Sequence, residues 1–92
     1  MNKFVLKLYI AGSTPHSQRV ADHFHRFCEH ELPNQCEYSI VDVLEHPEVA
    51  EQDGVLATPA LVRWFPPPAR RIIGDFCNPY RVLDELRIWP AR

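Results

Sequence analysis

The chain has 92 residues, of which 46% are apolar, and this length fits one domain while excluding an enzyme with separate cofactor and substrate lobes. It contains nine prolines against three glycines, whereas average proteins have about 5% proline and about 7% glycine, so Gly-rich phosphate-binding loops are not expected. The formal net charge of −2 gives no global basic field for binding nucleic acid or an anionic membrane.

The first half of the chain predicts a strand, a long helix and a second strand. Residues 4–10 are a nearly continuous apolar run, which favours a central strand covered on both faces. A helix is predicted after Pro15, because apolar residues recur at helical spacing at Val20, Phe24, Phe27 and Cys28. Pro33 and Asn34 end this helix, and residues 37–43 form a second strand, which should run parallel to the first.

The second half predicts a short helix followed by two short strands. Pro47 stands in the first turn of the short helix, and Gly54 is placed to cap its C-terminal end. Residues 60–65 form the next strand. After the proline triplet at 66–68, residues 71–74 can return as a short antiparallel strand.

A last helix begins at Asn78 and Pro79, which form a good N-cap and first-turn pair, and it carries Val82, Leu83 and Leu86. The resulting order, β-α-β-α-β-β-α, predicts a thioredoxin-like α/β fold over residues 1–92. Local signals conflict, however, because residues 86–89 alternate like an edge strand and residues 68–76 could begin a helix. Two arrangements of the second half are therefore compatible with the sequence.

The cysteines argue against redox chemistry. A thioredoxin-like oxidoreductase places a CxxC motif between the first strand and the first helix, and residues 13–16 contain no cysteine there. Cys28 lies on the apolar helix face and is expected in the core, whereas Cys36 and Cys77 lie near loops. Three cysteines without a CxxC pair suggest neither a disulfide scaffold nor a zinc ribbon, and they fit reduced thiols in the cytoplasm.

Other catalytic and ligand-binding signatures are missing from the sequence. His23, His25 and His30 share one helix at spacings that do not favour a common metal ion, and no cofactor motif is present. No apolar run approaches the about 20 residues that span a bilayer. Thr58 and Pro59 precede a strand, where thioredoxin-like domains hold a cis-proline that presents backbone to a partner.

Charge is distributed unevenly along the chain. Residues 1–59 carry a net charge of −5, whereas residues 60–92 carry +3, and all basic side chains of the second part are arginines. Arginine suits recognition of carboxylates and phosphates. Arg63, Arg70 and Arg71 lie near Trp64 and Phe65, a composition typical of protein-binding surfaces and less suited, in an acidic chain, to single-stranded nucleic acid.

The strings KFVLKLYIAGSTP, DVLEHPEVAEQDGVLATPALV and PPPARRIIGD, in this order and spacing, resemble the KaiB family of circadian clock proteins over residues 3–84. The resemblance implies a non-enzymatic regulator that binds the hexameric ATPase KaiC, sequesters KaiA with it and competes with the histidine kinase SasA. It also implies two folds, namely a β-α-β-β-α-α-β tetramer and a monomeric thioredoxin-like form that binds KaiC.

Carried over by position, the resemblance implies a KaiC-facing surface that includes Arg19, Ala50, Glu51, Asp53, Arg70 and Arg71. Gly54 stands where well-studied family members have lysine, and Glu85 and Arg87 stand where they have glycine and aspartate.

Replacement of glycine at position 85, the Asn78–Pro79 cap and an Arg81/Glu85 pair favour a C-terminal helix. We therefore predict that the thioredoxin-like form predominates, with Gly54, Pro59, Asn78, Pro79, Glu85 and Arg87 setting the conformation.

Two other functions remain open at this point. One is a KaiB-like adaptor in stress or other signalling, which binds a KaiC-like ATPase without KaiA. The other, from the enzyme class, is a thiol oxidoreductase. A homo-oligomer, either a tetramer or a dimer, is expected for the alternative fold.

Overall fold

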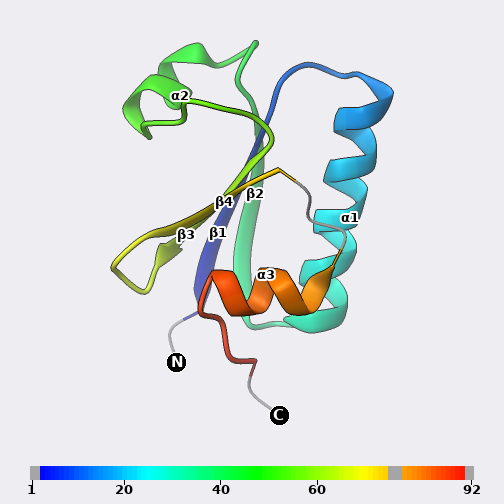
Figure 1. Cartoon of the computed structure of the whole chain (residues 1–92), viewed down its shortest axis with the longest axis vertical. Helices are drawn as coiled ribbons and strands as arrows, with labels where there is room; N and C mark the ends of the chain where they lie inside the picture. The colour runs from blue at the N-terminus through cyan, green and yellow to red at the C-terminus, as the bar shows by residue number, and fades with distance from the viewer. Residues whose placement is uncertain (1–2, 75–77, 91–92) are drawn as a thin grey trace.

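The computed structural model describes residues 3–74 and 78–90. The elements follow the predicted order β-α-β-α-β-β-α (Figure 1). They are β1 (Phe4–Ile10), α1 (Pro15–Glu31), β2 (Cys36–Asp42), α2 (Pro47–Gln52), β3 (Ala60–Phe65), β4 (Arg70–Ile73) and α3 (Pro79–Glu85). The thioredoxin-like arrangement is thus confirmed, and the alternative β-α-β-β-α-α-β order is not the one this structure has.

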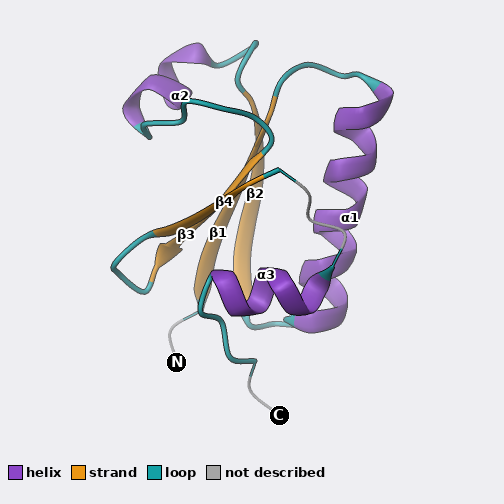
Figure 2. Ribbon diagram, viewed as in Figure 1, coloured by secondary structure: helices purple, strands orange, loops and turns teal. Residues whose placement is uncertain are grey.

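The strands form one four-stranded sheet in the order β2-β1-β3-β4 (Figure 2). β1 pairs with β2 in parallel and with β3 antiparallel, and β3 pairs antiparallel with β4. β1 is central, as its apolar run predicted, because Leu6 and Leu8 are buried on one face of the sheet and Tyr9 on the other.

Helices cover both faces of the sheet. On one face, α1 and α3 pack against β1, β3 and β4 in the larger apolar core, which includes Leu6, Phe24, Leu61, Ile72 and Val82. On the other face, the segment around α2 covers a smaller cluster built on Tyr9, Ala60 and Val62. The second half of the chain therefore contributes residues to both apolar cores.

Side chains at the helix ends explain why the helices begin where they do. Each helix has proline in its first turn, which costs no hydrogen bond there. The Thr14 hydroxyl accepts a hydrogen bond from the Ser17 amide at 3.0 Å, and the Asn78 side-chain oxygen accepts from the Tyr80 and Arg81 amides. The predicted cap of the last helix is confirmed.

Two strand boundaries differ from those predicted by one residue. β2 is Cys36–Asp42, not 37–43, because Phe4 at the start of β1 pairs with Cys36. β4 is Arg70–Ile73, not 71–74, because Arg70 pairs with Arg63 while Gly74 leaves the strand with a φ of +110°. Cys77 lies outside the described residues.

Candidate functional site

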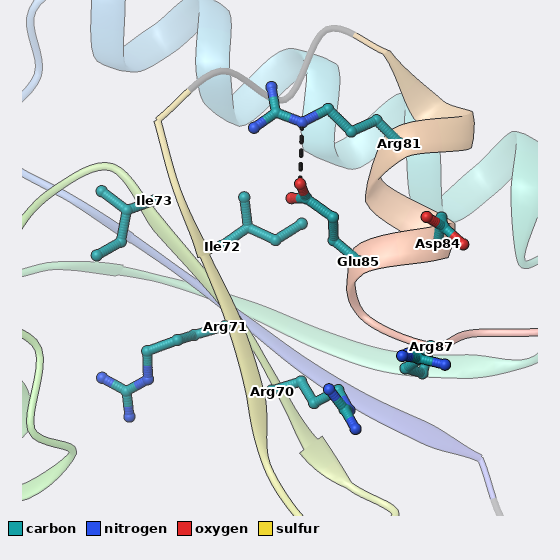
Figure 3. A pocket seen from close by; sticks show the side chains of 8 residues that line it. All are labelled: Arg70, Arg71, Ile72, Ile73, Arg81, Asp84, Glu85 and Arg87. Atoms are coloured by element: carbon teal, nitrogen blue, oxygen red, sulfur yellow. Dashed lines mark hydrogen bonds and ion pairs between the residues drawn. The ribbon is translucent and has the colours of Figure 1, made fainter.

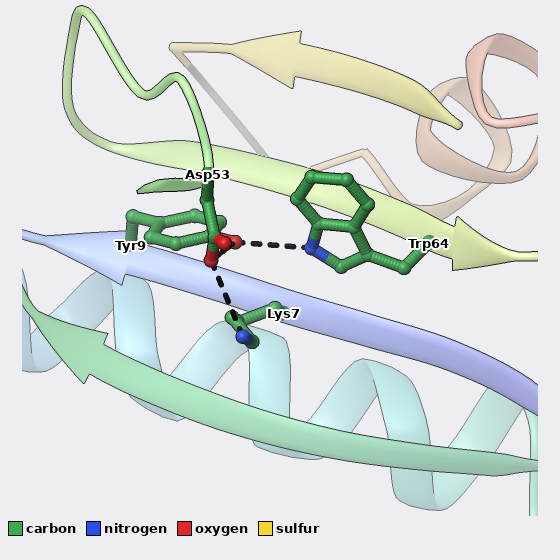
Figure 4. Close-up of polar contacts among 4 residues, drawn as sticks. All are labelled: Lys7, Tyr9, Asp53 and Trp64. Atoms are coloured by element: carbon green, nitrogen blue, oxygen red, sulfur yellow. Dashed lines mark hydrogen bonds and ion pairs between the residues drawn. The ribbon is translucent and has the colours of Figure 1, made fainter. Parts of the chain in front are cut away.

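The C-terminal end of α2 is attached to the sheet through Asp53. One carboxylate oxygen of Asp53 accepts hydrogen bonds from the Tyr9 hydroxyl at 2.7 Å and from the Lys7 ammonium at 3.3 Å (Figure 4). The Trp64 indole N–H donates to the same Tyr9 hydroxyl at 3.0 Å. Burial, followed by the hydrogen bond to Asp53, raises the pKa of Tyr9 above its usual value. Asp53 therefore positions the end of α2.

The turn after α2 contacts the edge strand β4. Gly54 has a φ of +69°; its amide donates to the Glu51 carbonyl and the Val55 amide donates to the Ala50 carbonyl, a pairing typical of a helix end. The predicted cap by Gly54 is confirmed. The Arg71 guanidinium donates to the Gly54 carbonyl at 3.0 Å, so segments that are 17 residues apart form one surface.

A hollow of about 560 Å³ lies between β4 and α3. Its walls are all four residues of β4 and, from α3 and its last turn, Arg81, Asp84, Glu85 and Arg87 (Figure 3). The Arg81 guanidinium donates to the Glu85 carboxylate at 3.3 Å, as the i,i+4 spacing predicted. Four arginines and two carboxylates give this hollow a net positive charge, and we call it the basic groove.

The prediction that Arg63 belongs to the exposed arginine surface is wrong. Arg63 is only 4% exposed, and its guanidinium donates to the carbonyls of Leu86 at 2.6 Å, of Pro66, and of Pro68 at 3.3 Å. Burial, together with the charge of Arg70, lowers the pKa of the Arg63 guanidinium. Arg63 therefore ties β3 to the end of α3 and to the proline turn.

The connection between β1 and α1 contains hydroxyl side chains and no cysteine. Thr14 and Ser17 line a small hollow of about 150 Å³ together with Thr58 and Pro59, and the Thr58–Pro59 bond is cis, as its position predicted. The Ser17 hydroxyl donates to the Ala11 carbonyl at 3.3 Å, which commits it to holding the start of the helix.

Neither of the two described cysteines is fully exposed. Cys28 is buried in the larger core, as predicted, and Cys36 is half-buried. Burial is the main cause that raises the pKa of both thiols, which keeps them protonated at neutral pH.

Of the six residues predicted to face a partner, Asp53 is half-buried and bonded to Tyr9 and Lys7 within the chain. Arg70 is exposed, but as the cross-strand partner of Arg63 it points to the α3 side of the sheet, whereas Arg71 points to the α2 side. Glu51 and Arg71 are exposed, Ala50 is half-buried, and these three belong to the joined surface of α2 and β4. Arg19 is also exposed, but it lies on α1, on the opposite face of the sheet. β1 and β2 are parallel, so both strands end at the same end of the sheet. Since α1 follows β1 and α2 follows β2, both helices begin at this end (Figure 1).

The residues predicted to set the conformation lie at turns and helix ends. Gly54 follows α2, Pro59 precedes β3, and the others bound α3: Asn78 and Pro79 at its start, Glu85 as its last residue, and Arg87 just beyond it with a φ of +55°.

Within residues 3–74 and 78–90, no three His, Cys, Asp or Glu side chains gather where a metal ion could be held. In the same part of the chain, no helix has the length and apolar character needed to cross a membrane.

Sequence reasoning missed the role of Tyr9 and the true place of Arg63. In the sequence Tyr9 is simply part of an apolar run, and no local pattern pairs it with Asp53, which lies 44 residues away. For Arg63 a signal was present, because it stands two residues after Leu61 in a strand and so shares its buried face.

Comparison with known proteins identifies the family of this chain. A family model described as the KaiB domain matches residues 7–88. The circadian clock protein KaiB3 of Synechocystis sp. is 43% identical over 90 residues, which cover 98% of this chain and 88% of that protein.

Two solved structures share the fold at low sequence identity. The N-terminal domain of SasA from Synechococcus elongatus superposes with a TM-score of 0.72 at 20% identity, covering 95% of this chain and 86% of that domain. Mitochondrial thioredoxin 3 of Saccharomyces cerevisiae superposes with a TM-score of 0.66 at 18% identity, covering 95% and 79% of the two chains.

Proposed function

The chain belongs to the KaiB family, and we propose that it is a non-enzymatic circadian clock regulator that acts in the cytoplasm by binding a KaiC-type ATPase hexamer. One observation carries the proposal, namely that the turn after α2 and the edge strand β4 are joined into one exposed surface through Arg71 and Gly54. By resemblance, this is where KaiB proteins in the thioredoxin-like form contact KaiC.

The proposed contact residues have distinct roles. Glu51, Arg70 and Arg71 touch the ATPase directly, and Ala50 provides a small side chain where the two surfaces approach each other. Asp53 acts indirectly, because its carboxylate holds Tyr9 and Lys7 and thereby fixes the orientation of α2. Arg19 extends the surface around the same end of the sheet.

The absence of turnover chemistry is part of the proposal. Residues 13–16 contain no cysteine where a thioredoxin-like enzyme needs one, and protonated, buried thiols such as Cys28 do not attack disulfides readily. The chain therefore acts through binding free energy alone.

We further propose that the bound chain helps sequester KaiA and displace a SasA-type kinase from the ATPase. A shared fold with the SasA N-terminal domain supports this, because two domains of one shape can compete for one site.

Gly54, Pro59, Asn78, Pro79, Glu85 and Arg87 are proposed to favour the thioredoxin-like form over the tetrameric one. A chain that already populates its binding-competent form loses no affinity to a preceding conformational change. Backbone chemical shifts and size measurement test this step: extended structure at residues 80–88 together with a stable tetramer would contradict it.

The function is tested by measuring binding to the KaiC-type ATPase of the same organism by interferometry. Charge reversal by Arg70→Glu is expected to weaken binding at least tenfold, because Arg70 is exposed and makes no hydrogen bond or ion pair with a described residue. The matched control, Arg26→Glu, reverses an exposed charge on α1.

Equal affinities for the two variants, or no binding by the unaltered chain at micromolar concentration, would refute the proposal. Binding to the ATPase without recruitment of KaiA would instead favour an adaptor outside a clock.

A further inference from the structure

The basic groove runs along the open edge of the sheet. Side chains of consecutive strand residues point to opposite faces, so a hollow lined by Arg70, Arg71, Ile72 and Ile73 together must follow the edge of β4 rather than one face. Residues 81, 84 and 85 of α3 are three and four positions apart and form the second wall (Figure 3).

Two guanidinium groups in the groove have no partner in the described part of the chain. The Arg81 guanidinium is paired with Glu85, and Arg71 donates to Gly54, whereas Arg70 and Arg87 make no hydrogen bond or ion pair with a described residue. The buried Arg63 lies across the strand pair from Arg70 and adds a further positive charge. Such unneutralised positive charge attracts carboxylates.

The backbone of β4 is available on the same side. β4 is the last strand in the order β2-β1-β3-β4, and within the described residues it pairs only with β3. The N–H and C=O groups of its outer edge can therefore pair with another extended segment.

We propose that the basic groove binds an extended acidic segment of a partner protein, which pairs with β4 as a fifth strand. In an extended segment, alternate side chains face the same way. Acidic residues at every second position would meet Arg70 and Arg87 on the α3 side. The residues between them would lie on the other side, beside Ile73, which is 53% exposed. The ligand is thus a segment in which acidic and apolar residues alternate.

This inference goes beyond the proposed function, because it needs neither the ATPase nor the clock. Its test uses the whole chain and a fluorescent peptide, acetyl-Glu-Val-Glu-Val-Glu-Val-amide, with binding followed by anisotropy and by amide chemical shifts. We expect saturable binding, with shifts concentrated at residues 70–73 and 81–87.

Two altered peptides test the geometry. A peptide of the same composition with the three Glu before the three Val keeps the charge but loses the alternation, and it should bind at least fivefold more weakly. N-methylation of alternate peptide bonds on the side that pairs with β4 should abolish binding.

The variant Arg87→Gly tests the charge without harming the fold, because glycine adopts the positive φ of this position readily. It should weaken binding of the alternating peptide about threefold to tenfold, as should Arg70→Gln, whereas Arg26→Gln on α1 should leave it unchanged.

The proposal is overturned if the alternating and block peptides bind equally, if N-methylation has no effect, or if the Arg26 control weakens binding as much as the groove variants. Because no ATPase is present, each of these results leaves the proposed function unaffected.

Discussion

The buried Arg63 side chain provides the sharpest test of how the second half of the chain is held together. Its guanidinium donates only to carbonyl oxygens, those of Leu86, Pro66 and Pro68. Leu86 is the C-cap residue of α3, so the positive charge lies where the helix dipole is negative. The substitution Arg63→Met removes the guanidinium and keeps most of the apolar stem.

The expected loss is set by the carbonyls left without a donor. A hydrogen bond from a charged donor contributes about 1.5–3 kcal/mol, and a charge at a helix C-terminus about 0.3–1 kcal/mol. The Arg63 guanidinium makes three such hydrogen bonds, and their combined loss is offset in part, because Met carries no charge that must be desolvated. We expect a net loss of about 2–4 kcal/mol from a free energy of unfolding of about 5–15 kcal/mol. At about 4–8 °C per kcal/mol, the melting temperature should fall by more than about 8 °C.

The assay is urea unfolding followed by circular dichroism, with Arg70→Met as the matched control. Arg63 and Arg70 are cross-strand partners, so the two substitutions remove the same group from adjacent positions, one buried and one exposed. The control should change the free energy of unfolding by less than about 0.5 kcal/mol. If the two variants lose equal stability, Arg63 does not hold α3.

Four further substitutions have expected outcomes. Tyr9→Phe should cost about 1–2 kcal/mol in urea unfolding at neutral pH, because it removes a hydroxyl bonded to a carboxylate. Since the pKa of Tyr9 is raised in the folded chain, stability should fall as the pH rises above about 10, where only the unfolded tyrosine ionises, and the variant should show a shallower fall. Gly54→Ala should lower the free energy of unfolding by about 1 kcal/mol, and Arg87→Gly, at the equivalent position after α3, should raise it by up to about 1 kcal/mol in thermal unfolding. Asn78→Ala should cost about 1 kcal/mol and speed amide exchange within residues 79–85.

The elements that the sequence predicted well are those whose signals are local. The apolar run at residues 4–10 can be buried on both faces only at the centre of a sheet, and β1 is there. Thr14 and Asn78 cap the helices that follow them because a cap needs only its neighbours three residues away. The residues that determine each of these features lie within a few positions of one another in the sequence.

The contacts of the candidate site could not be predicted in the same way, because they join distant segments. Asp53 was expected to face a partner, and its bonds to Lys7 and Tyr9 depend on how α2 lies across the sheet. Proximity in the sequence and equal charge suggest that Arg63 and Arg70 belong to one surface. The pairing of β3 with β4 places both on the same face, but only the packing of α3 decides that one is buried and the other exposed.

The conflict at residues 86–89 has a physical resolution in the last turn of α3. Their alternation suggested an edge strand, and it does bury Leu86 and Ile88 while exposing Arg87 and Trp89. The helix end achieves the same result, because Arg87 takes a φ of +55° and the Ile88 amide turns back to bond the Leu83 carbonyl at 2.9 Å. A left-handed residue after a helix reverses the chain, so that its neighbours on either side both face the core. Burial of every second residue over four positions is therefore compatible with a helix end as well as with a strand. The N-cap at Asn78, eight residues before Leu86, favours the helix.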